Sequence, residues 1–250
     1  MKKAMKKISI ILAVFGFTML LFTGCEDTTD DVSSITKYPV FDMTGDAVMF
    51  HKLGDPFTDP GVTATEGGSQ IDVSTNTVGV FNNPSYEAED IDPNTADKYI
   101  KTYSATNSDG FDGMTTRTVY VAETGDLVNS IAGVYECSVD REAPPESYAG
   151  IQYVMIWETS TPGTYAISHA LGGFYSDGRG YGYLYSGQGA TITVNDISTN
   201  DFTFTDGFVP GFGLPAVITG MTVDAANKTI KFDADFVSGT YIFHVTLKQV

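Results

Sequence analysis

The sequence predicts an all-β protein of two domains, and three observations support this prediction. Threonine, valine, tyrosine and phenylalanine dominate the ordered stretches, which is the composition of β-strands. Short apolar segments are separated at close intervals by glycine, proline, aspartate and asparagine, which mark turns. No convincing amphipathic helix follows the first 24 residues.

Residues 1–24 have the three parts of an export signal. Lysines precede an apolar run from Ile8 to Phe22, and two small residues stand before Cys25. The run is about fifteen residues long, which is short of the ~20 that a transmembrane helix needs. The stretch LLFTGC resembles the lipobox of bacterial lipoproteins. This resemblance implies lipidation of Cys25, removal of residues 1–24 and a membrane anchor made by the lipid. An ordinary secretory signal with an incidental cysteine is the alternative.

Residues 25–36 are rich in aspartate, threonine and serine, and we expect them to form an acidic flexible tether. Their acids, Glu26, Asp27, Asp30 and Asp31, resemble the export signal of Bacteroidetes surface lipoproteins. The resemblance implies a lipid-anchored protein of the outer membrane that faces the cell exterior. A solvated tether without a sorting role is the other reading.

Charge and cysteine content narrow the classes of partner. The chain has 14 basic and 31 acidic residues, and loss of the four signal lysines changes its net charge from −17 to −21. Such a chain repels phosphate backbones, so nucleic acid is excluded as a partner, and polyanions are disfavoured while neutral ligands are not. With Cys25 lipidated, Cys137 has no disulfide partner. It alternates with Tyr135 and Val139 in a predicted strand, which indicates a buried, inert thiol.

Residues 37–123 are predicted to form an Ig-like β-sandwich. The stretches GDPFTDPGVTATEGG and YIKTYSATNSDGFDGMTTRTVYV resemble bacterial Ig-like modules of surface proteins. Such modules mostly act as spacers, so the resemblance implies a stalk. The link FNNPSYEAEDIDPNTADK is longer than is usual in these modules. Strands are expected at 47–50, 62–65, 71–74, 98–106 and 115–121. The matching motif residues are Asp59, Pro60, Gly61, Val62, Tyr99, Tyr103, Ala105, Asn107, Gly110, Arg117, Val119 and Val121.

Residues 126–250 are predicted to form a second antiparallel β-domain, either a barrel or a sandwich. The opening Gly-x-Tyr strand resembles those of lipocalin-like barrels and weights the choice toward a barrel. The stretches YAISHALGGFYSDGRGYGYLY and GTYIFHVTL resemble the C-terminal module of Bacteroidetes lipoproteins of unknown function that are found near glycan-uptake systems. Strands are expected near 133–139, 151–158, 163–169, 180–186, 189–195, 201–205, 216–223, 228–234 and 239–248.

A glycine-rich stretch in this second domain contains the candidate ligand-binding residues. Tyr181, Tyr183 and Tyr185 have period two, so a strand would place their rings on one face. An aromatic row beside charged groups suits a neutral sugar, whereas the alternative is an aromatic stripe of the core. The predicted ligand-binding residues are Trp157, Phe174, Tyr175, Asp177, Arg179, Tyr181 and Tyr183.

The sequence contains no pattern for catalysis, a metal or a cofactor. His51, His169 and His244 lie far apart and lack metal-ligand spacing, and His169 is expected in the core or at its rim. No nucleophile elbow is present. The turns EDIDPNTAD and SDGFDG carry enough oxygens for calcium but lack EF-hand spacing, which favours solvated turns.

We therefore predict a non-catalytic cell-surface lipoprotein that binds a neutral oligosaccharide in a glycan-uptake system. One alternative is a structural or assembly subunit that contacts an outer-membrane transporter or a sister lipoprotein. A glycoside hydrolase is a further alternative, and it requires two carboxylates across a cleft.

Overall fold

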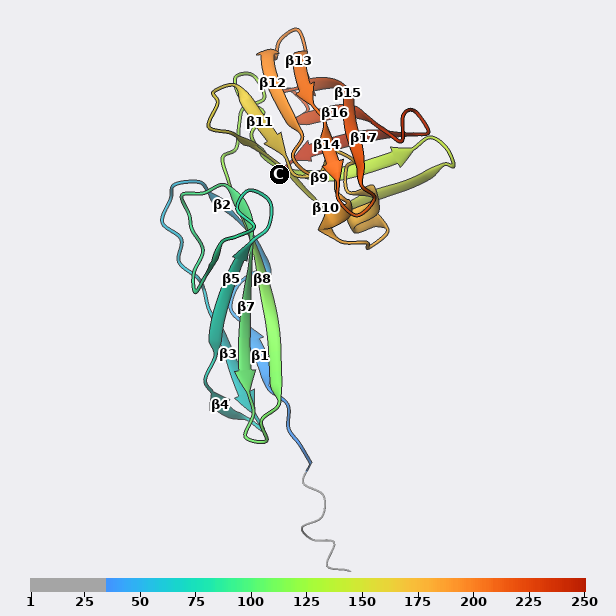
Figure 1. Cartoon of the computed structure of the whole chain (residues 1–250). Coiled ribbons are helices and arrows are strands. Elements are labelled where there is room, and N and C mark those ends of the chain that lie inside the picture. The colour runs from blue at the N-terminus through green and yellow to red at the C-terminus, as the bar shows by residue number, and fades with distance from the viewer. Residues whose placement is uncertain (1–34) are drawn as a thin grey trace, which may run out of the picture. The chain divides into compact units, whose positions relative to one another are not determined.

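The computed structural model describes residues 35–250, apart from the side chains of residues 151 and 152. Residues 38–250 form one compact unit that is almost entirely β, as predicted. Figure 1 shows the N-terminal strands in blue to green and the C-terminal strands in yellow to red. The predicted signal peptide, the lipidation site Cys25 and nearly all of the tether lie outside the described residues. Within residues 35–250, no helix has the length and apolarity needed to cross a membrane.

The N-terminal domain is an Ig-like sandwich of two sheets, whose strands lie between residues 40 and 122. Strand β2 pairs with β8 in parallel, and the other pairings are antiparallel. One sheet has the order β1 (Val40–Met43), β3 (Val62–Glu66), β4 (Ser69–Ile71), and the other has the order β2 (Val48–Lys52), β8 (Asp112–Ala122), β7 (Asp97–Thr106), β5 (Ser74–Gly79), β6 (Glu87–Ala88).

The strands expected at 47–50, 62–65, 98–106 and 115–121 are present as β2, β3, β7 and β8, whereas β1 and β6 were not predicted. The strand expected at 71–74 is two strand ends, because β4 ends at Ile71 and β5 begins at Ser74. The chain leaves one sheet and enters the other between them. Apolar alternation runs through this crossover, so the pattern did not reveal the change of sheet.

The Ig-like motif residues meet in a buried ionic cluster. The Asp59 carboxylate accepts hydrogen bonds from the Gly61 N–H (3.1 Å) and the Tyr103 hydroxyl (2.9 Å). It also pairs with Lys101 (3.3 Å) and with Arg117, whose side chain is fully buried. Burial by itself raises the pKa of Asp59, but these hydrogen bonds and the two cations bring it below the usual value. The motif therefore ties a turn to both central strands of the sheet.

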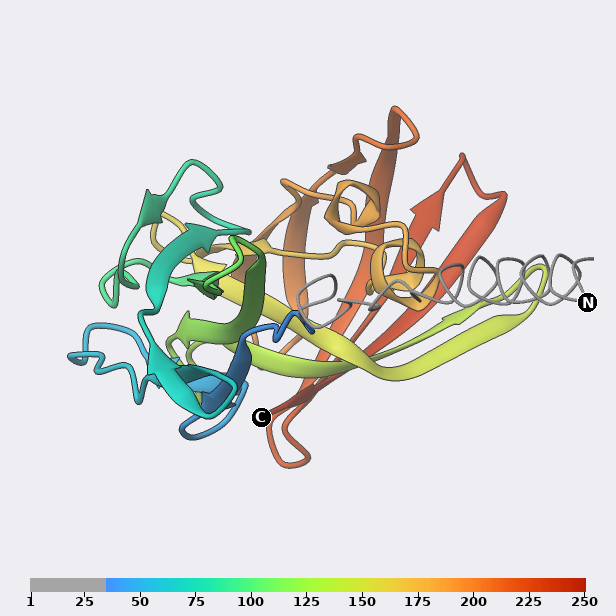
Figure 2. The ribbon, with the colours of Figure 1, turned by 90° about the horizontal axis from the view of Figure 1, so that it is seen from below.

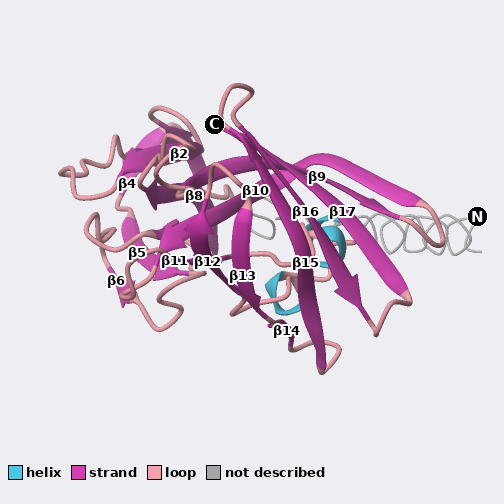
Figure 3. Cartoon of the chain, turned by 90° about the horizontal axis from the view of Figure 1, so that it is seen from above, coloured by secondary structure: helices cyan, strands magenta, loops and turns pink. Residues whose placement is uncertain are grey.

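The C-terminal domain is a nearly closed antiparallel barrel, which decides between the two architectures left open by the sequence. Its end strands, β13 and β14, are separated only by Asp206, so the chain itself brings the edges of the sheet together. Figure 3 shows the strands curving around two short helices. In the described residues the strand order is β13 (Asp201–Thr205), β12 (Thr191–Asp196), β11 (Thr164–Ile167), β10 (Glu146–Glu158), β9 (Gly133–Arg141), β17 (Tyr241–Gln249), β16 (Thr229–Phe236), β15 (Leu214–Asp224), β14 (Gly207–Val209).

The barrel interior holds the alternating apolar face of each strand. On β17, Phe243, Val245 and Leu247 are buried while His244 is exposed, as the period-two pattern predicts. Cys137 on β9 is buried and free, with its thiol 3.3 Å from the Gly172 carbonyl oxygen. Burial raises the pKa of Cys137 to about 12, which keeps the thiol protonated at neutral pH.

The strand predicted at 180–186 is wrong. This part of the chain is a loop with two helical turns, a π-helix η2 (Phe174–Gly178) and a 3₁₀-helix η3 (Tyr183–Tyr185), which the curved strands surround in Figure 2. Gly180 and Gly182 have φ of +69° and +88°, a conformation that bends the chain out of a strand. The tyrosines alternate with these glycines, so their spacing imitates a strand without forming one.

The first half of this loop fills the barrel. Leu171 and Phe174 are fully buried, and the Phe174 ring packs 4.9 Å from that of Phe243 on β17. Gly172 allows this approach, because a Cβ atom there would lie 2.8 Å from the Val245 side chain. The segment is therefore part of the core and not an added surface strand.

Candidate binding site at the domain junction

An apolar cluster joins the two domains. Phe50 and Tyr120 of the Ig-like sheet contact Tyr153 of the barrel, with ring centroids 5.0 and 5.5 Å apart. Phe81 contacts Tyr183 (5.0 Å) on the barrel side. The buried members of the junction cluster are Tyr120, Ala122, Val134, Met155 and Trp157.

The long link between β5 and β7 positions Phe81. The buried Asp97 carboxylate accepts N–H groups from Phe81 (2.7 Å), Asn82 (3.1 Å) and Asn83 (2.9 Å), which folds this loop around one anion. Lys98, the next residue, lies over the Phe81 ring at 5.5 Å. The long link thus places Phe81 in contact with Tyr183 of the barrel.

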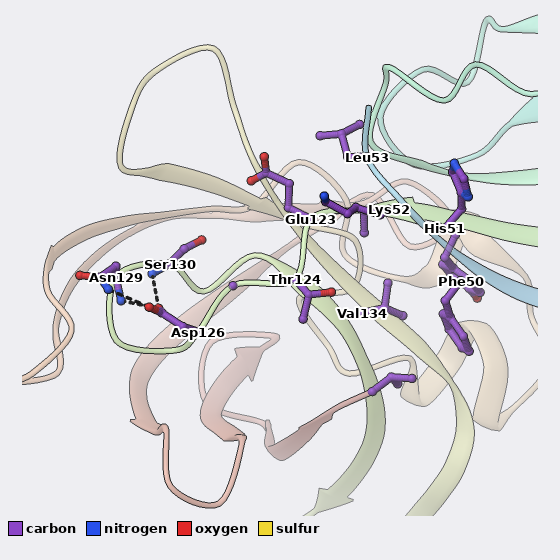
Figure 4. A pocket seen from close by; sticks show the side chains of 14 residues that line it. Phe50, His51, Lys52, Leu53, Glu123, Thr124, Asp126, Asn129, Ser130 and Val134 are labelled. Atoms are coloured by element: carbon purple, nitrogen blue, oxygen red, sulfur yellow. Dashed lines mark hydrogen bonds between the residues drawn. The ribbon is translucent and has the colours of Figure 1, made fainter. Parts of the chain in front are cut away.

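A cavity of about 680 Å³, here called the main cavity, opens beside this cluster. Its aromatic wall comes from Phe50, whose ring stacks on Tyr120 with centroids 5.7 Å apart and an interplanar angle of 20°. Phe50 is 45% exposed, so part of its side chain is accessible. Figure 4 shows Phe50 and His51 projecting from β2 and Val134 from the barrel side. The volume lies within the range of ligand pockets, roughly 300–1,000 Å³.

The opposite wall of the main cavity is polar. It includes Glu123, Thr124, Asp126 and Asn129 from the loop that joins the domains. Asp126 accepts the N–H groups of Val128 (2.9 Å) and Asn129 (2.7 Å), and these hydrogen bonds hold its pKa well below the usual range. The Asp126 carboxylate thus orders its own loop. Among the acidic side chains that line this cavity, Glu123 is therefore the one available to contact a ligand.

Two smaller cavities continue along the junction. The connecting cavity, of about 180 Å³, is lined by residues that include Leu53, Ala96, Glu123, Trp157 and Glu158. The aromatic cavity, of about 320 Å³, is lined by residues that include Phe81, Trp157, Tyr183, Gln188 and Phe208.

The structure divides the predicted ligand-binding residues between two places. Trp157 and Tyr183 meet at the aromatic cavity. Phe174 and Tyr175 are buried in the barrel, so they present almost no ring surface to solvent. Tyr181 is 49% exposed and stacks on Tyr175 with centroids 6.4 Å apart.

The two predicted charged residues, Arg179 and Asp177, also have different partners. Arg179 is held by Glu146, with Nη2 and Oε2 2.5 Å apart, and lies over the Phe174 and Tyr175 rings. Asp177 lies 3.6 Å from the Nε2 atom of His169. The two charges therefore contact different parts of the barrel domain.

His169 is a core histidine, as predicted, although a serine and an aspartate lie beside it. Burial, aided by Lys98, lowers the pKa of His169 to about 3, and burial raises the pKa of Asp177. An ion pair would shift both in the opposite directions, so the imidazole is neutral at pH 7. Ser168 Oγ, 2.7 Å from the His169 Nδ1 atom, also accepts the Met155 N–H and is fully buried. No substrate has access to this serine, so the group is structural.

Sequence reasoning identified Trp157 and Tyr183 but missed the other residues that line the cavities, among them Phe50, Glu123 and Gln188. The one sequence signal for these cavities was the long link at 81–98, whose length indicated a loop specific to this family. No group of three or more His, Cys, Asp or Glu residues that could hold a metal occurs in residues 35–250.

Comparison with known proteins agrees with both domains. Residues 41–121 match the family model described as bacterial surface protein, Ig-like domain, and residues 124–249 match a model for a C-terminal domain. The crystal structure of the lipoprotein BT2262 from Bacteroides thetaiotaomicron is similar to this chain with a TM-score of 0.66 and 30% identity, covering 85% of this chain and 100% of that one. The chain belongs to the BT2262 family. No curated protein matches it. The matches to the BT2262 family and to the Ig-like surface domain indicate a surface-lipoprotein type of protein and point to no catalytic family.

Proposed function

We propose that the chain is a lipid-anchored protein of the outer membrane that binds a neutral oligosaccharide in the main cavity without catalysis. The observation that carries this proposal is the pairing of an accessible, rigidly held aromatic ring with a wall of hydroxyl, amide and carboxylate groups. Sugars have apolar ring faces and a polar rim, and a cavity of this kind complements both.

The Phe50 ring is suited to stacking because it is preorganised. Tyr120 supports one face and Tyr153 packs against it edge to face, so little side-chain freedom is lost when a ligand binds. The ring remains accessible on the cavity side.

The charges around the cavity favour a neutral ligand. The lining carries both signs, because Lys52 lines the same cavity as Glu123 and Asp126. The net charge of −17 for the whole chain disfavours anionic glycans at longer range. Glycoside hydrolysis needs two available carboxylates, and among the lining residues Asp126 is engaged by its own loop.

Calorimetry with residues 36–250 and a panel of neutral and acidic oligosaccharides tests this function. Phe50→Ala should weaken binding markedly, because micromolar to millimolar affinity amounts to only about 8 to 4 kcal/mol. Val48→Ala is the matched control, since Val48 is exposed on the same strand and does not line the cavity. Glu123→Gln keeps the shape of the wall and should weaken binding. Unchanged affinity in both cavity variants, or binding of acidic glycans alone, would contradict the proposal.

An assembly role is the second candidate, and an exposed apolar patch favours it. Leu184 (60% exposed) and Phe212 lie on two neighbouring segments that are joined by the hydrogen bond from the Gly211 N–H to the Leu184 carbonyl oxygen. Such a patch suits contact with an outer-membrane transporter or a sister lipoprotein. Leu184→Glu should then weaken that association and leave sugar binding unchanged. The members of the patch are Tyr181, Leu184, Phe208, Phe212 and Leu214.

A further inference from the structure

The three junction cavities form a row. The main and connecting cavities share Leu53 and Glu123, and the connecting and aromatic cavities share Trp157. The shared residues show that neighbouring cavities have a common wall. The row follows the edge of the apolar cluster that joins the domains, whose members Trp157 and Ala96 also line it.

Each cavity in the row pairs an aromatic ring with a polar side chain. Phe50 faces the Thr124 and Asn129 wall in the main cavity. Trp157 stands with Glu123 and Glu158 in the connecting cavity. A repeated pairing of this kind suits a ligand that itself repeats, with one apolar ring face and several hydroxyls per unit.

The aromatic cavity closes the row with the densest set of rings. Phe81, Trp157, Tyr183 and Phe208 surround Gln188. The Gln188 Nε2 atom donates to the Tyr183 carbonyl oxygen (2.8 Å), which fixes the side chain and leaves its carboxamide oxygen as an acceptor. The Gln188 and Phe208 backbones exchange hydrogen bonds of 2.7 and 2.8 Å, which hold the two residues side by side at this cavity, and Phe208 is 50% exposed.

We propose that the ligand is a linear neutral oligosaccharide that lies along the junction, from the main cavity to the aromatic cavity, so that affinity depends on chain length. This inference rests on the proposed function. It adds the substrate class and extends the binding site from the main cavity to the aromatic cavity. The walls come from both domains, because Leu53 and Phe81 belong to the Ig-like sandwich and Trp157 and Gln188 to the barrel. The bound chain therefore clamps the two domains together.

The test is calorimetry of residues 36–250 with two linear neutral series, maltose to maltoheptaose and cellobiose to cellohexaose. In the series that binds, the dissociation constant should fall by about tenfold or more between the disaccharide and the hexasaccharide, equivalent to ~1.4 kcal/mol or more. Phe50→Ala should weaken binding of both lengths. Phe208→Ala and Gln188→Ala should weaken the hexasaccharide only and leave disaccharide affinity unchanged. Leu184→Ala is the control, since Leu184 is exposed nearby and lines none of these cavities.

The failures of the two proposals are distinguishable. Equal affinity for all lengths, with loss in Phe50→Ala and no effect of Phe208→Ala, overturns the extended site and leaves the main cavity as a sugar site. An absence of binding at every length in both series overturns the extended site and the proposed function for these ligands together. A hexasaccharide that binds Phe208→Ala as tightly as the unchanged protein also overturns the extended site, whatever its length dependence.

Discussion

At the scale of single residues, the buried histidine of the barrel makes stability depend on pH. His169 stays neutral when folded because burial and Lys98 lower its pKa to about 3, whereas an unfolded histidine takes up a proton below about pH 6.5. The unfolded state then binds more protons, so stability falls as the pH is lowered from about 6.5 toward 3, by up to ~1.4 kcal/mol per unit. Burial raises the pKa of Asp177, so this residue changes the pH dependence of stability in the opposite direction. The contribution of His169 is therefore isolated by comparing a His169 variant with the unchanged protein.

We expect His169→Gln to flatten the dependence of unfolding free energy on pH between 6 and 4, measured by urea denaturation. His244→Gln is the contrast. The hydrogen bond with Asp233 raises the pKa of His244, so its contribution is present below the unfolded pKa and is lost as the pH rises. That variant should leave the slope between pH 6 and 4 unchanged and alter the curve only above about pH 6.5. An unchanged slope between pH 6 and 4 in His169→Gln would show that the pKa of His169 is not lowered by folding.

At the scale of elements, the loop between β11 and β12 gives neighbouring tyrosines opposite roles. Tyr175 is buried against Phe236 and Phe243, while Tyr181 lies at the surface. Tyr175→Ala should cost roughly 3 to 5 kcal/mol, as for other buried rings. Tyr181→Ala should cost under about 1 kcal/mol, as for most surface changes. Urea unfolding of residues 36–250 measures both, and similar losses would mean that the loop packs differently from this structure.

At the scale of the whole molecule, each domain has its own core and the cavities lie between them. The Ig-like domain packs around Tyr99, Val119 and Val121, and the barrel around its own interior cluster. We expect residues 36–123 and 126–250 each to unfold cooperatively when separated, and neither to bind the oligosaccharide at full affinity. Calorimetric unfolding of the two fragments checks this expectation. A fragment without a transition would mean that the junction cluster is required for folding and that the two parts are one domain.

Much of the fold was predictable because it depends on local patterns. Alternation on β9 and β17 identifies the buried face of each strand, since successive side chains of a strand point to opposite sides. The Asp59 turn and its Arg117 partner were recognisable from the motif that carries them. The barrel was predictable only as one of two architectures, because closure depends on how the two end strands meet.

The sequence by itself determined the β composition, the Ig-like motif, the alternating faces of most strands and the acidic character that disfavours polyanions as ligands. Only the tertiary structure decided which tyrosines are buried, because Gly180 and Gly182 adopt positive φ and turn an apparent strand into a loop. It also decided where a ligand has room. Phe50, Phe81, Trp157 and Gln188 are distant in sequence, and their grouping into cavities depends on how the faces of two folded domains fit against each other, a long-range property that no local spacing records.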